Sequence, residues 1–490
     1  MAAADTASTS AGSGAATPMQ AAASGSGSGS GSGSAGPSAA ASAPASVSAS
    51  ASGPALTGKL VKAMDIAAPF TREVRDVIKH RVETLKKRAP RLVGILAKPY
   101  PPSIAYAQWT KKACEDVGIQ FDIWKTWDDA GAEGAEDAEV SADDVREDYS
   151  LAADVEDLII AANADDSVDG IMVYYPIFTG RQDTYLQQIV DPRKDVEGLH
   201  FSYCWNMYHN VRWILPSQLG GAPGTMSEPP PAYFQSSTYL ASQHSASPSP
   251  ILGTENTAPP GFAKSILPCT PLAIVKCLES MGMYEGQLPY GDRLLNKTVT
   301  VINRSEVVGR PLAALLANDG ARVFSVDIDN ILEFSKRSVH ERRASAYGGA
   351  PNANAVQGAP EGTSIAGGDR RRRSKAVIAA QEKIAEGKLR SAHTIKACSK
   401  TLQECLAVSD IVISGVPSAS YKIRTAWIKE GATCINFSSE KNFESDVRAR
   451  AAQFLPAIGK TTISMVQRNL MRLVQYKEET KAAAAATATS

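Results

Sequence analysis

The residues best placed to do chemistry lie between Lys297 and Asp327, where strand-like and helix-like segments alternate. Val299 to Ile302 is a β-branched run, and Asn303 to Ser305 is a short polar turn. Gly309 stands where a new helix would begin, because leucines recur at helical spacing after it. Such a strand–turn–helix–strand unit offers the phosphates of a dinucleotide a helix N-terminus. The G-x-G-x-x-G pattern is absent from this unit, so a βαβ unit without a ligand is the competing interpretation.

Asp327 ends the second strand of this unit. A carboxylate at that place accepts hydrogen bonds from both ribose hydroxyls of NAD and repels a 2′-phosphate, which favours NAD as the cofactor. Arg304 and Arg310 could hold a phosphate, so NADP is the alternative. The residues expected around the pyrophosphate and its ribose are Asn303, Arg304, Ser305, Val308, Gly309 and Arg310.

A second group of candidate cofactor residues follows the predicted strand from Ile411 to Ser414. In an open parallel sheet, ligands bind at the carboxyl ends of the strands. We therefore expect the turn Ser414, Gly415, Val416 and Pro417 to face the cofactor. Asn436 lies near the end of another predicted strand, Thr433 to Phe437, and is a weaker candidate.

The elements that must position these residues follow one pattern, in which helix and strand alternate from Leu56 onwards. This alternation predicts an α/β fold with a mostly parallel sheet. The predicted helices span 71–87, 105–117, 155–162 and 463–476, and the predicted strands of the first half span 92–96, 121–124 and 170–174.

Composition excludes several classes of protein. With 490 residues the chain is long enough for two domains, and its 51 basic residues balance 51 acidic ones. That balance gives no electrostatic footprint for nucleic acid, and no apolar run approaches the roughly 20 residues of a membrane span. The seven cysteines form no C-x-x-C, which suits reduced thiols in a cytoplasmic protein and predicts no metal site.

Three segments depart from the globular pattern. Residues 1–55 are rich in Ala, Ser and Gly, with Asp5 as the only charged residue, and are predicted to be disordered. Residues 213–262 and 338–392 are predicted insertions, the second with a possible helix at 376–388 and the cluster Arg370 to Arg373 before Ser374. We interpret that cluster as a solvated charge run, with a phosphosite or a polyanion contact as alternatives.

An ordered series of motifs makes the prediction of function more specific. They are Asp169 to Pro176, Lys194 to Leu199, Ile266 to Pro271, Ser409 to Pro417, Gly431 to Asn436 and Gly459 to Met465. The series resembles the methylenetetrahydrofolate dehydrogenase/cyclohydrolase family, most closely its monofunctional, NAD-using, fungal-type branch. The resemblance covers most of Leu56 to Lys477 apart from the two insertions.

The resemblance implies two domains with a cleft between them. A folate-binding domain at 56–285 would be followed by a Rossmann-like NAD-binding domain at 286–455. A last helix, at 456–480, would return to the first domain. It also implies a homodimer in one-carbon metabolism that oxidises 5,10-methylenetetrahydrofolate to 5,10-methenyltetrahydrofolate. A hydride leaves the bridging carbon for the nicotinamide, and no proton has to be removed in that step, so catalysis should rest on positioning.

The resemblance assigns three residues to the folate. Tyr106 matches a tyrosine that stacks on the folate, although a boundary aromatic on an amphipathic helix is the alternative. Asp195 and Glu197 match an acidic motif whose second acid hydrogen-bonds the pterin ring. The alternative for each acid is a salt bridge to Lys194 or Arg193.

Two departures from the family pattern concern the hydrolytic step. Bifunctional members carry a lysine at the position of Thr110 and a glutamine at the position of Tyr174. Their absence predicts a dehydrogenase without cyclohydrolase activity. A bifunctional enzyme that uses another residue, or a non-catalytic dinucleotide-binding sensor, remains the alternative.

Overall fold

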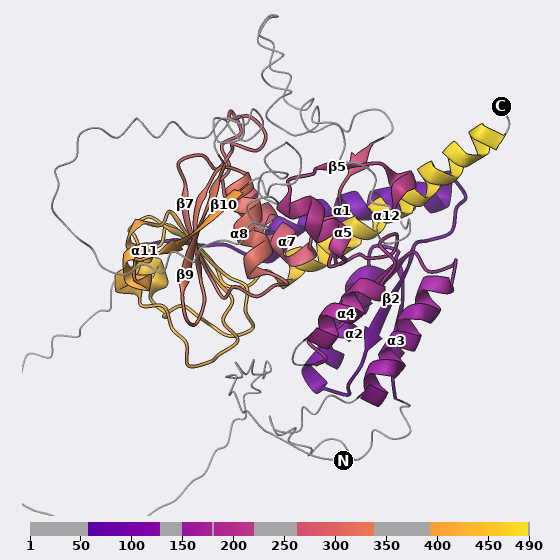
Figure 1. Cartoon of the computed structure of the whole chain (residues 1–490), viewed down its shortest axis with the longest axis horizontal. Coiled ribbons are helices and arrows are strands. Elements are labelled where there is room, and N and C mark those ends of the chain that lie inside the picture. The colour runs from indigo at the N-terminus through magenta and orange to yellow at the C-terminus, as the bar shows by residue number, and fades with distance from the viewer. Residues whose placement is uncertain (1–56, 128–148, 179–180, 220–261, 338–392, 489–490) are drawn as a thin grey trace, which may run out of the picture.

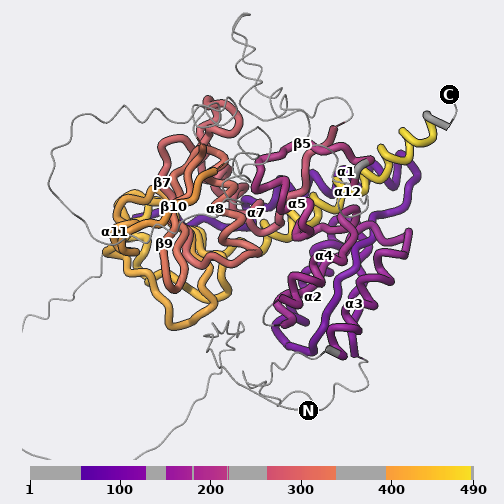
Figure 2. The backbone as a smooth tube through the Cα atoms, viewed as in Figure 1, coloured from indigo at the N-terminus to yellow at the C-terminus, as the bar shows by residue number. Residues whose placement is uncertain are grey.

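The computed structural model describes residues 57–127, 149–178, 181–219, 262–337 and 393–488. These residues form two α/β lobes, which a pair of long helices joins (Figure 1). The tube view follows the same path, with the indigo N-terminal helix beside the yellow C-terminal one (Figure 2). No helix among the described residues is both long enough and apolar enough to cross a membrane.

The smaller lobe is built on a three-stranded parallel sheet. Its order is β3 (Gln120–Lys125), β2 (Arg91–Leu96), β4 (Gly170–Val173). Alternate residues of β2 face opposite sides, as the period of a strand requires. Leu92 packs towards α2 (Pro101–Glu115), whereas Val93 packs towards α3 (Tyr149–Ala164) and α4 (Arg181–Ile189).

The larger lobe contains an eight-stranded sheet in the order β1-β13-β12-β11-β7-β8-β9-β10. All pairs are parallel except β8 with β9 and β9 with β10. The strands are β1 (Lys59–Leu60), β7 (Thr298–Ile302), β8 (Arg322–Val326), β9 (Ile331–Lys336), β10 (His393–Cys398), β11 (Ile411–Ser414), β12 (Thr433–Asn436) and β13 (Gln453–Leu455).

Helices cover both faces of this sheet. α7 (Cys269–Ser280) and α8 (Gly309–Asn318) bury one face, and α11 (Leu402–Val408) packs over the other. The parallel strands and these helices confirm the predicted Rossmann-like lobe. The predicted mostly parallel sheet holds for all but the two strands at one edge.

The division into lobes does not follow the sequence strictly. The first domain was predicted to begin at residue 56, but β1 pairs in parallel with β13 and so completes the larger sheet. Periodicity alone cannot reveal this, because a two-residue strand has no pattern of its own.

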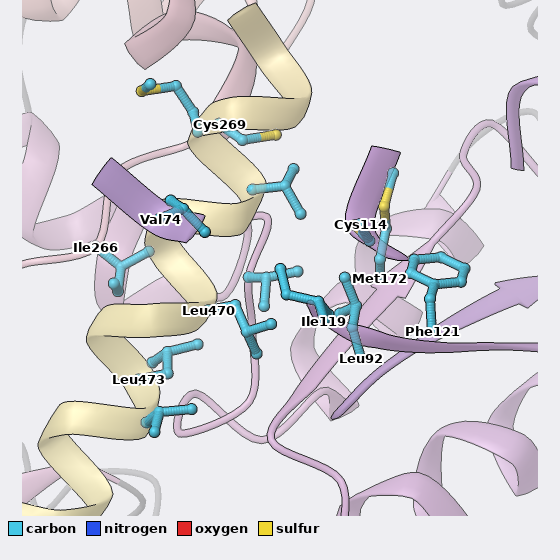
Figure 3. Packing of buried hydrophobic residues seen from close by; sticks show 14 of the residues in the cluster. Val74, Leu92, Cys114, Ile119, Phe121, Met172, Ile266, Cys269, Leu470 and Leu473 are labelled. Atoms are coloured by element: carbon cyan, nitrogen blue, oxygen red, sulfur yellow. The ribbon is translucent and has the colours of Figure 1, made fainter. Parts of the chain in front are cut away.

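Two long helices tie the lobes together. α1 (Ala63–Lys79), which continues as a π-helical turn at His80–Thr84, lies along α12 (Gly459–Ala488). Leu470 and Leu473 of α12 pack against the small sheet beside Leu92 and Ile119 (Figure 3). The last helix therefore packs on the first domain as predicted. It runs from Gly459 to Ala488, beyond both the helix predicted at 463–476 and the end of the C-terminal segment predicted at 456–480.

The remaining short elements surround these lobes. They are α5 (Phe201–Tyr208), β5 (Trp213–Ile214), β6 (Ala263–Lys264), and 3-10 turns at Pro216–Gln218, Thr425–Trp427 and Val447–Ala449.

Both predicted insertions leave and re-enter the fold at paired strands. The first was predicted to start at 213, but Trp213 pairs with Lys264, so the fold continues beyond that residue, and the structure describes it up to 219. The second joins β9 to β10, where Lys336 is opposite His393. The predicted disordered segment at 1–55, the arginine cluster and the possible helix at 376–388 all lie outside the described residues.

Candidate functional site

Tyr106 and Tyr174 meet edge to face at one edge of the small lobe. Tyr106 lies on α2 and Tyr174 directly follows β4, and their ring centroids are 5.9 Å apart at 88°. α2 begins with two prolines, which fit the first turn of a helix because no hydrogen bond is lost there. The structure therefore brings the tyrosine that the resemblance assigns to the folate next to Tyr174, which stands at the glutamine position of the bifunctional members.

Thr110 lies one turn after Tyr106 and is fully buried. Its hydroxyl donates to the Tyr106 carbonyl at 2.8 Å, so its only proton is already engaged. Burial raises the pKa of the Tyr174 phenol, and the nearby Thr110 hydroxyl opposes only part of that effect. The buried Tyr174 hydroxyl has no hydrogen-bond partner among the described residues. Both groups are thus held neutral.

Glu197 lies beside the end of β4, where Oε2 accepts a hydrogen bond from the Val173 amide at 3.0 Å. Among the described residues no donor reaches Oε1. Burial, with a further contribution from Asp195, raises the pKa of Glu197 to about 8. Oε1 is therefore available to a ligand, and the group changes charge close to neutral pH.

Asp195 has a different environment. Its Oδ1 accepts from the amides of Glu197 and Gly198 at 3.0 and 2.8 Å, and its Oδ2 accepts from the His200 amide at 2.8 Å. Burial raises its pKa to about 6, against these hydrogen bonds. Through these three hydrogen bonds, Asp195 holds the backbone of the loop that carries Glu197.

The salt-bridge alternative for these acids is wrong. Lys194 donates to three backbone carbonyls of residues 162, 163 and 165, at 2.7–2.9 Å. Arg193 pairs with Asp191 instead.

The Pro-Cys-Thr-Pro loop, Pro268 to Pro271, leads into the first turn of α7 and packs against the loop that carries Glu197. The Cys269 amide donates to the Glu197 carbonyl at 3.0 Å. Burial raises the pKa of the Cys269 thiol to about 12. The thiol therefore stays protonated, which argues against a role as a nucleophile.

In the larger lobe, the turn after β7 is tied to the turn after β11. Asn303 has a left-handed backbone, with φ 83°, and its Nδ2 donates to the Gly415 carbonyl at 2.6 Å. A Cβ on Gly309 would lie 1.8 Å from the Asn303 carbonyl oxygen, so only glycine fits at the start of α8. Ser305 caps the turn, because its Oγ accepts from the amides of Val308 and Gly309 at 3.2 and 3.3 Å.

The donor groups of this turn fit a dinucleotide. Within the described residues, no acceptor is recorded for the backbone N–H groups of residues 304–307, which precede the N-terminus of α8. Unpaired amides at a helix start are the usual ligands of a pyrophosphate. Asp327 follows β8, its side chain 41% exposed and Oδ2 3.9 Å from Arg304 Nη1.

The two arginines of this region are already engaged. Arg304 donates to Ser325 Oγ at 3.0 Å and to Asn330 Oδ1 at 2.8 Å, which fastens it under the turn after β8. Arg310 pairs with Glu306 at 2.7 Å and lies over the Tyr208 ring of α5 at 5.2 Å. The Arg304 guanidinium is thus held by protein groups, whereas Arg310 takes part in an exposed ion pair; the backbone amides of residues 304–307 remain as candidate phosphate donors.

The second predicted turn is held by a residue that sequence reasoning missed. Asn442 is fully buried, and its Oδ1 accepts from Ser414 Oγ at 3.0 Å and from the Val416 amide at 2.8 Å. Asn436 Oδ1 in turn accepts a hydrogen bond from the backbone N–H of Asn442 at 3.3 Å. Ser414 and Asn436 are thus placed as buried supports, whereas Pro417 is exposed at the rim. A buried asparagine six residues after a strand carries no signal in the sequence.

No cluster of His, Cys, Asp or Glu suited to a metal occurs in the described parts of the chain.

The geometry defines a two-domain α/β protein with a Rossmann-type dinucleotide-binding lobe and, beside it, a lobe bearing an aromatic pair and a titratable acid. Family models match both lobes: the tetrahydrofolate dehydrogenase/cyclohydrolase catalytic domain at residues 62–197 and its NAD(P)-binding domain at residues 268–338. The chain belongs to the tetrahydrofolate dehydrogenase/cyclohydrolase family.

Fungal relatives cover nearly the whole of this fold. The methylenetetrahydrofolate dehydrogenase [NAD(+)] of Schizosaccharomyces pombe is 36% identical, over 87% of this chain and 96% of its own. The enzyme of the same name from Saccharomyces cerevisiae is 37% identical, over 86% and 98%. The solved structure of the yeast NAD-dependent enzyme superposes with a TM-score of 0.60 and covers 86% of this chain and 98% of its own.

Proposed function

We propose that this protein oxidises 5,10-methylenetetrahydrofolate to 5,10-methenyltetrahydrofolate with NAD, and that it does not hydrolyse the product. The names of the fungal relatives support the first part, together with Asp327 at the end of β8. The observation that carries the second part is the neutral pair Thr110 and Tyr174, which stands where bifunctional members have lysine and glutamine.

In this proposal the side chains bind and orient the folate. NAD supplies the hydride acceptor when bound. Tyr106 provides a flat surface for the folate, and Glu197 Oε1 accepts from the paired N–H donors of the pterin edge. Asp195 holds that carboxyl in place through the loop amides. Once its carboxyl has lost its proton, Glu197 favours the positive charge that develops on the folate nitrogens, so kcat/KM should rise with pH near the pKa of Glu197.

Hydrolysis would need a different group. In bifunctional members the lysine polarises the folate and guides proton movement during attack by water. Here the Thr110 proton is engaged by a backbone carbonyl, and burial raises the pKa of the Tyr174 phenol. Neither group exchanges a proton readily near neutral pH, so the methenyl product should be released intact.

The experiment follows two absorbance signals. Purified protein is incubated with 5,10-methylenetetrahydrofolate and NAD, and formation of NADH is recorded. Methenyltetrahydrofolate is then added alone, and its decay is compared with decay in buffer. Formation of NADH with an unaccelerated decay supports the proposal. An accelerated decay indicates the bifunctional alternative, and absence of NADH indicates the sensor.

We also propose a cytoplasmic homodimer that associates through the larger lobe. The resemblance supports the dimer, and the reduced-type cysteine pattern supports the location. Light scattering after size exclusion tests the dimer, and fractionation with a tagged chain tests the location.

A further inference from the structure

Asn469 lies inside the first lobe, far along the sequence from every residue of the folate site. It is fully buried on α12. Its Nδ2 donates to the Val196 carbonyl at 2.9 Å and to the Leu267 carbonyl at 3.1 Å. One side chain therefore spans two loops, one that carries Glu197 and one that leads into Pro268 and Cys269.

These loops are also in direct backbone contact. Gly198 has φ +72°, and a Cβ there would lie 2.7 Å from the Leu267 carbonyl carbon. The Cys269 amide donates to the Glu197 carbonyl at 3.0 Å. Among the described residues, only Asn469 is recorded as a donor to the Val196 and Leu267 carbonyls. Without it, both carbonyls would be left unsatisfied inside the protein.

We propose that Asn469 is a positioning residue for the reaction, because it fixes the Glu197 loop against the Pro-Cys-Thr-Pro loop and so sets where the Glu197 carboxyl meets the folate. The inference rests on the proposed function of this site. Asn469 acts through Val196 and Leu267 and makes no contact with substrate. Both hydrogen bonds that the Asn469 amide donates leave α12, so this amide joins the two loops rather than stabilising its own helix. Its Oδ1 is buried without a partner among the described residues.

The same helix offers a matched control. Thr461 is a fully buried polar residue of α12, and its hydroxyl donates to the Ala63 carbonyl at 3.4 Å, towards α1. It makes no recorded contact with either loop of the folate site. The Thr461 hydroxyl also accepts from the Cys277 thiol of α7 at 3.7 Å, so Thr461→Val removes two buried hydrogen bonds of α12 without releasing Glu197.

The test compares Asn469→Leu, which keeps the volume and removes both donors, with Thr461→Val and the unchanged protein. For Asn469→Leu we expect kcat/KM for 5,10-methylenetetrahydrofolate to fall roughly ten- to hundredfold, mostly through KM, while KM for NAD stays unchanged. A merely structural role would lower the active fraction, and so kcat, with both KM values unchanged. That result, or the same folate KM in Asn469→Leu and Thr461→Val, would overturn the proposal.

A second readout follows the acid itself. A loosened loop exposes Glu197 to water, so its pKa should move down from about 8 towards its ordinary value. The rise of kcat/KM with pH should then shift to lower pH in Asn469→Leu and not in Thr461→Val. An unshifted profile would contradict the positioning role.

A substitute variant and a binding measurement distinguish failure of this proposal from misfolding and from failure of the proposed function. If Asn469→Leu does not fold, Asn469→Ser replaces it, since a shorter hydroxyl cannot span both carbonyls, and the same criteria apply. If the unchanged protein makes no NADH, the proposed function fails by itself. Calorimetric titration with tetrahydrofolate then tests Asn469 directly, with weaker binding expected in the variant and equal binding as the contrary result.

Discussion

Asp327 is the residue on which cofactor choice should depend. It is exposed after β8, with a fastened Arg304 beside it. Asp327→Ser should weaken the interaction with NAD by about 1–3 kcal/mol, the scale of a charge-assisted hydrogen bond, which lowers kcat/KM for NAD and raises the relative efficiency of NADP. Asp329→Ser, in the same exposed turn, is the control. Steady-state kinetics with both cofactors measure the ratio, and an unchanged ratio would remove Asp327 from the cofactor site.

Thr110 and Tyr174 should determine whether the product is hydrolysed. Thr110→Lys alone places an ammonium at a fully buried position, so we expect a loss of roughly 1–3 kcal/mol in stability and no hydrolysis. Thr110→Lys with Tyr174→Gln supplies the amide that would orient the lysine. Decay of added methenyltetrahydrofolate should exceed the buffer rate in the double variant only. Hydrolysis by the unchanged protein would show that the monofunctional proposal is wrong.

Glu197 should make stability depend on pH. Its pKa is raised from 4.5 to about 8, so between those values the folded state binds more protons than the unfolded chain. The free energy of unfolding should therefore fall as pH rises through this window. Glu197→Gln cannot ionise, so its stability relative to the unchanged protein should increase from pH 5 to pH 9. Urea denaturation at both pH values measures this, and a constant difference would show that Glu197 is not buried enough to matter.

At the scale of elements, the sequence predicted where the strands end, but not the buried amide side chains that hold the turns and loops after those strands. The β-branched runs at Val299 and Ile411 identified the strands, and the polar turns after them followed. Asn442 and Asn469 escaped prediction because their partners lie far away in the sequence, and a single buried amide has no periodicity. The roles of Tyr106, Asp195 and Glu197 in binding folate remain predictions.

The β9–β10 pair bears directly on the second insertion. Because Lys336 lies opposite His393, a short turn can join the two strands without moving them. Replacing residues 338–392 by such a turn should leave turnover intact and raise the free energy of unfolding by no more than roughly 2 kcal/mol, the scale of loop closure.

Deleting residues 1–54 should likewise leave turnover unchanged. Activity and thermal unfolding measure both, and a folded but inactive product would show that a deleted segment completes the site.

At the scale of the whole molecule, α12 stabilises the first lobe from the far end of the chain. Leu470 is fully buried in the core shared with Leu92 and Val196. Leu470→Ala should lower the free energy of unfolding by about 2–5 kcal/mol, because the packed sheet cannot collapse into the cavity. Lys481→Ala, exposed on the same helix, should change it by less than about 0.5 kcal/mol. Urea denaturation compares them, and equal losses would show that α12 adds little to this core.

The crossed ends of the chain also set an order of events during synthesis. β1 leaves the ribosome early but has no partner until β13 follows, and the small sheet is made long before α12 can cover it. The larger sheet therefore gains its β1–β13 pair, and the smaller sheet its cover by α12, only after residue 453 has been made. The nascent chain therefore exposes the apolar face of the small sheet throughout the synthesis of the larger lobe, which makes this face a site for chaperone binding or aggregation until α12 is made.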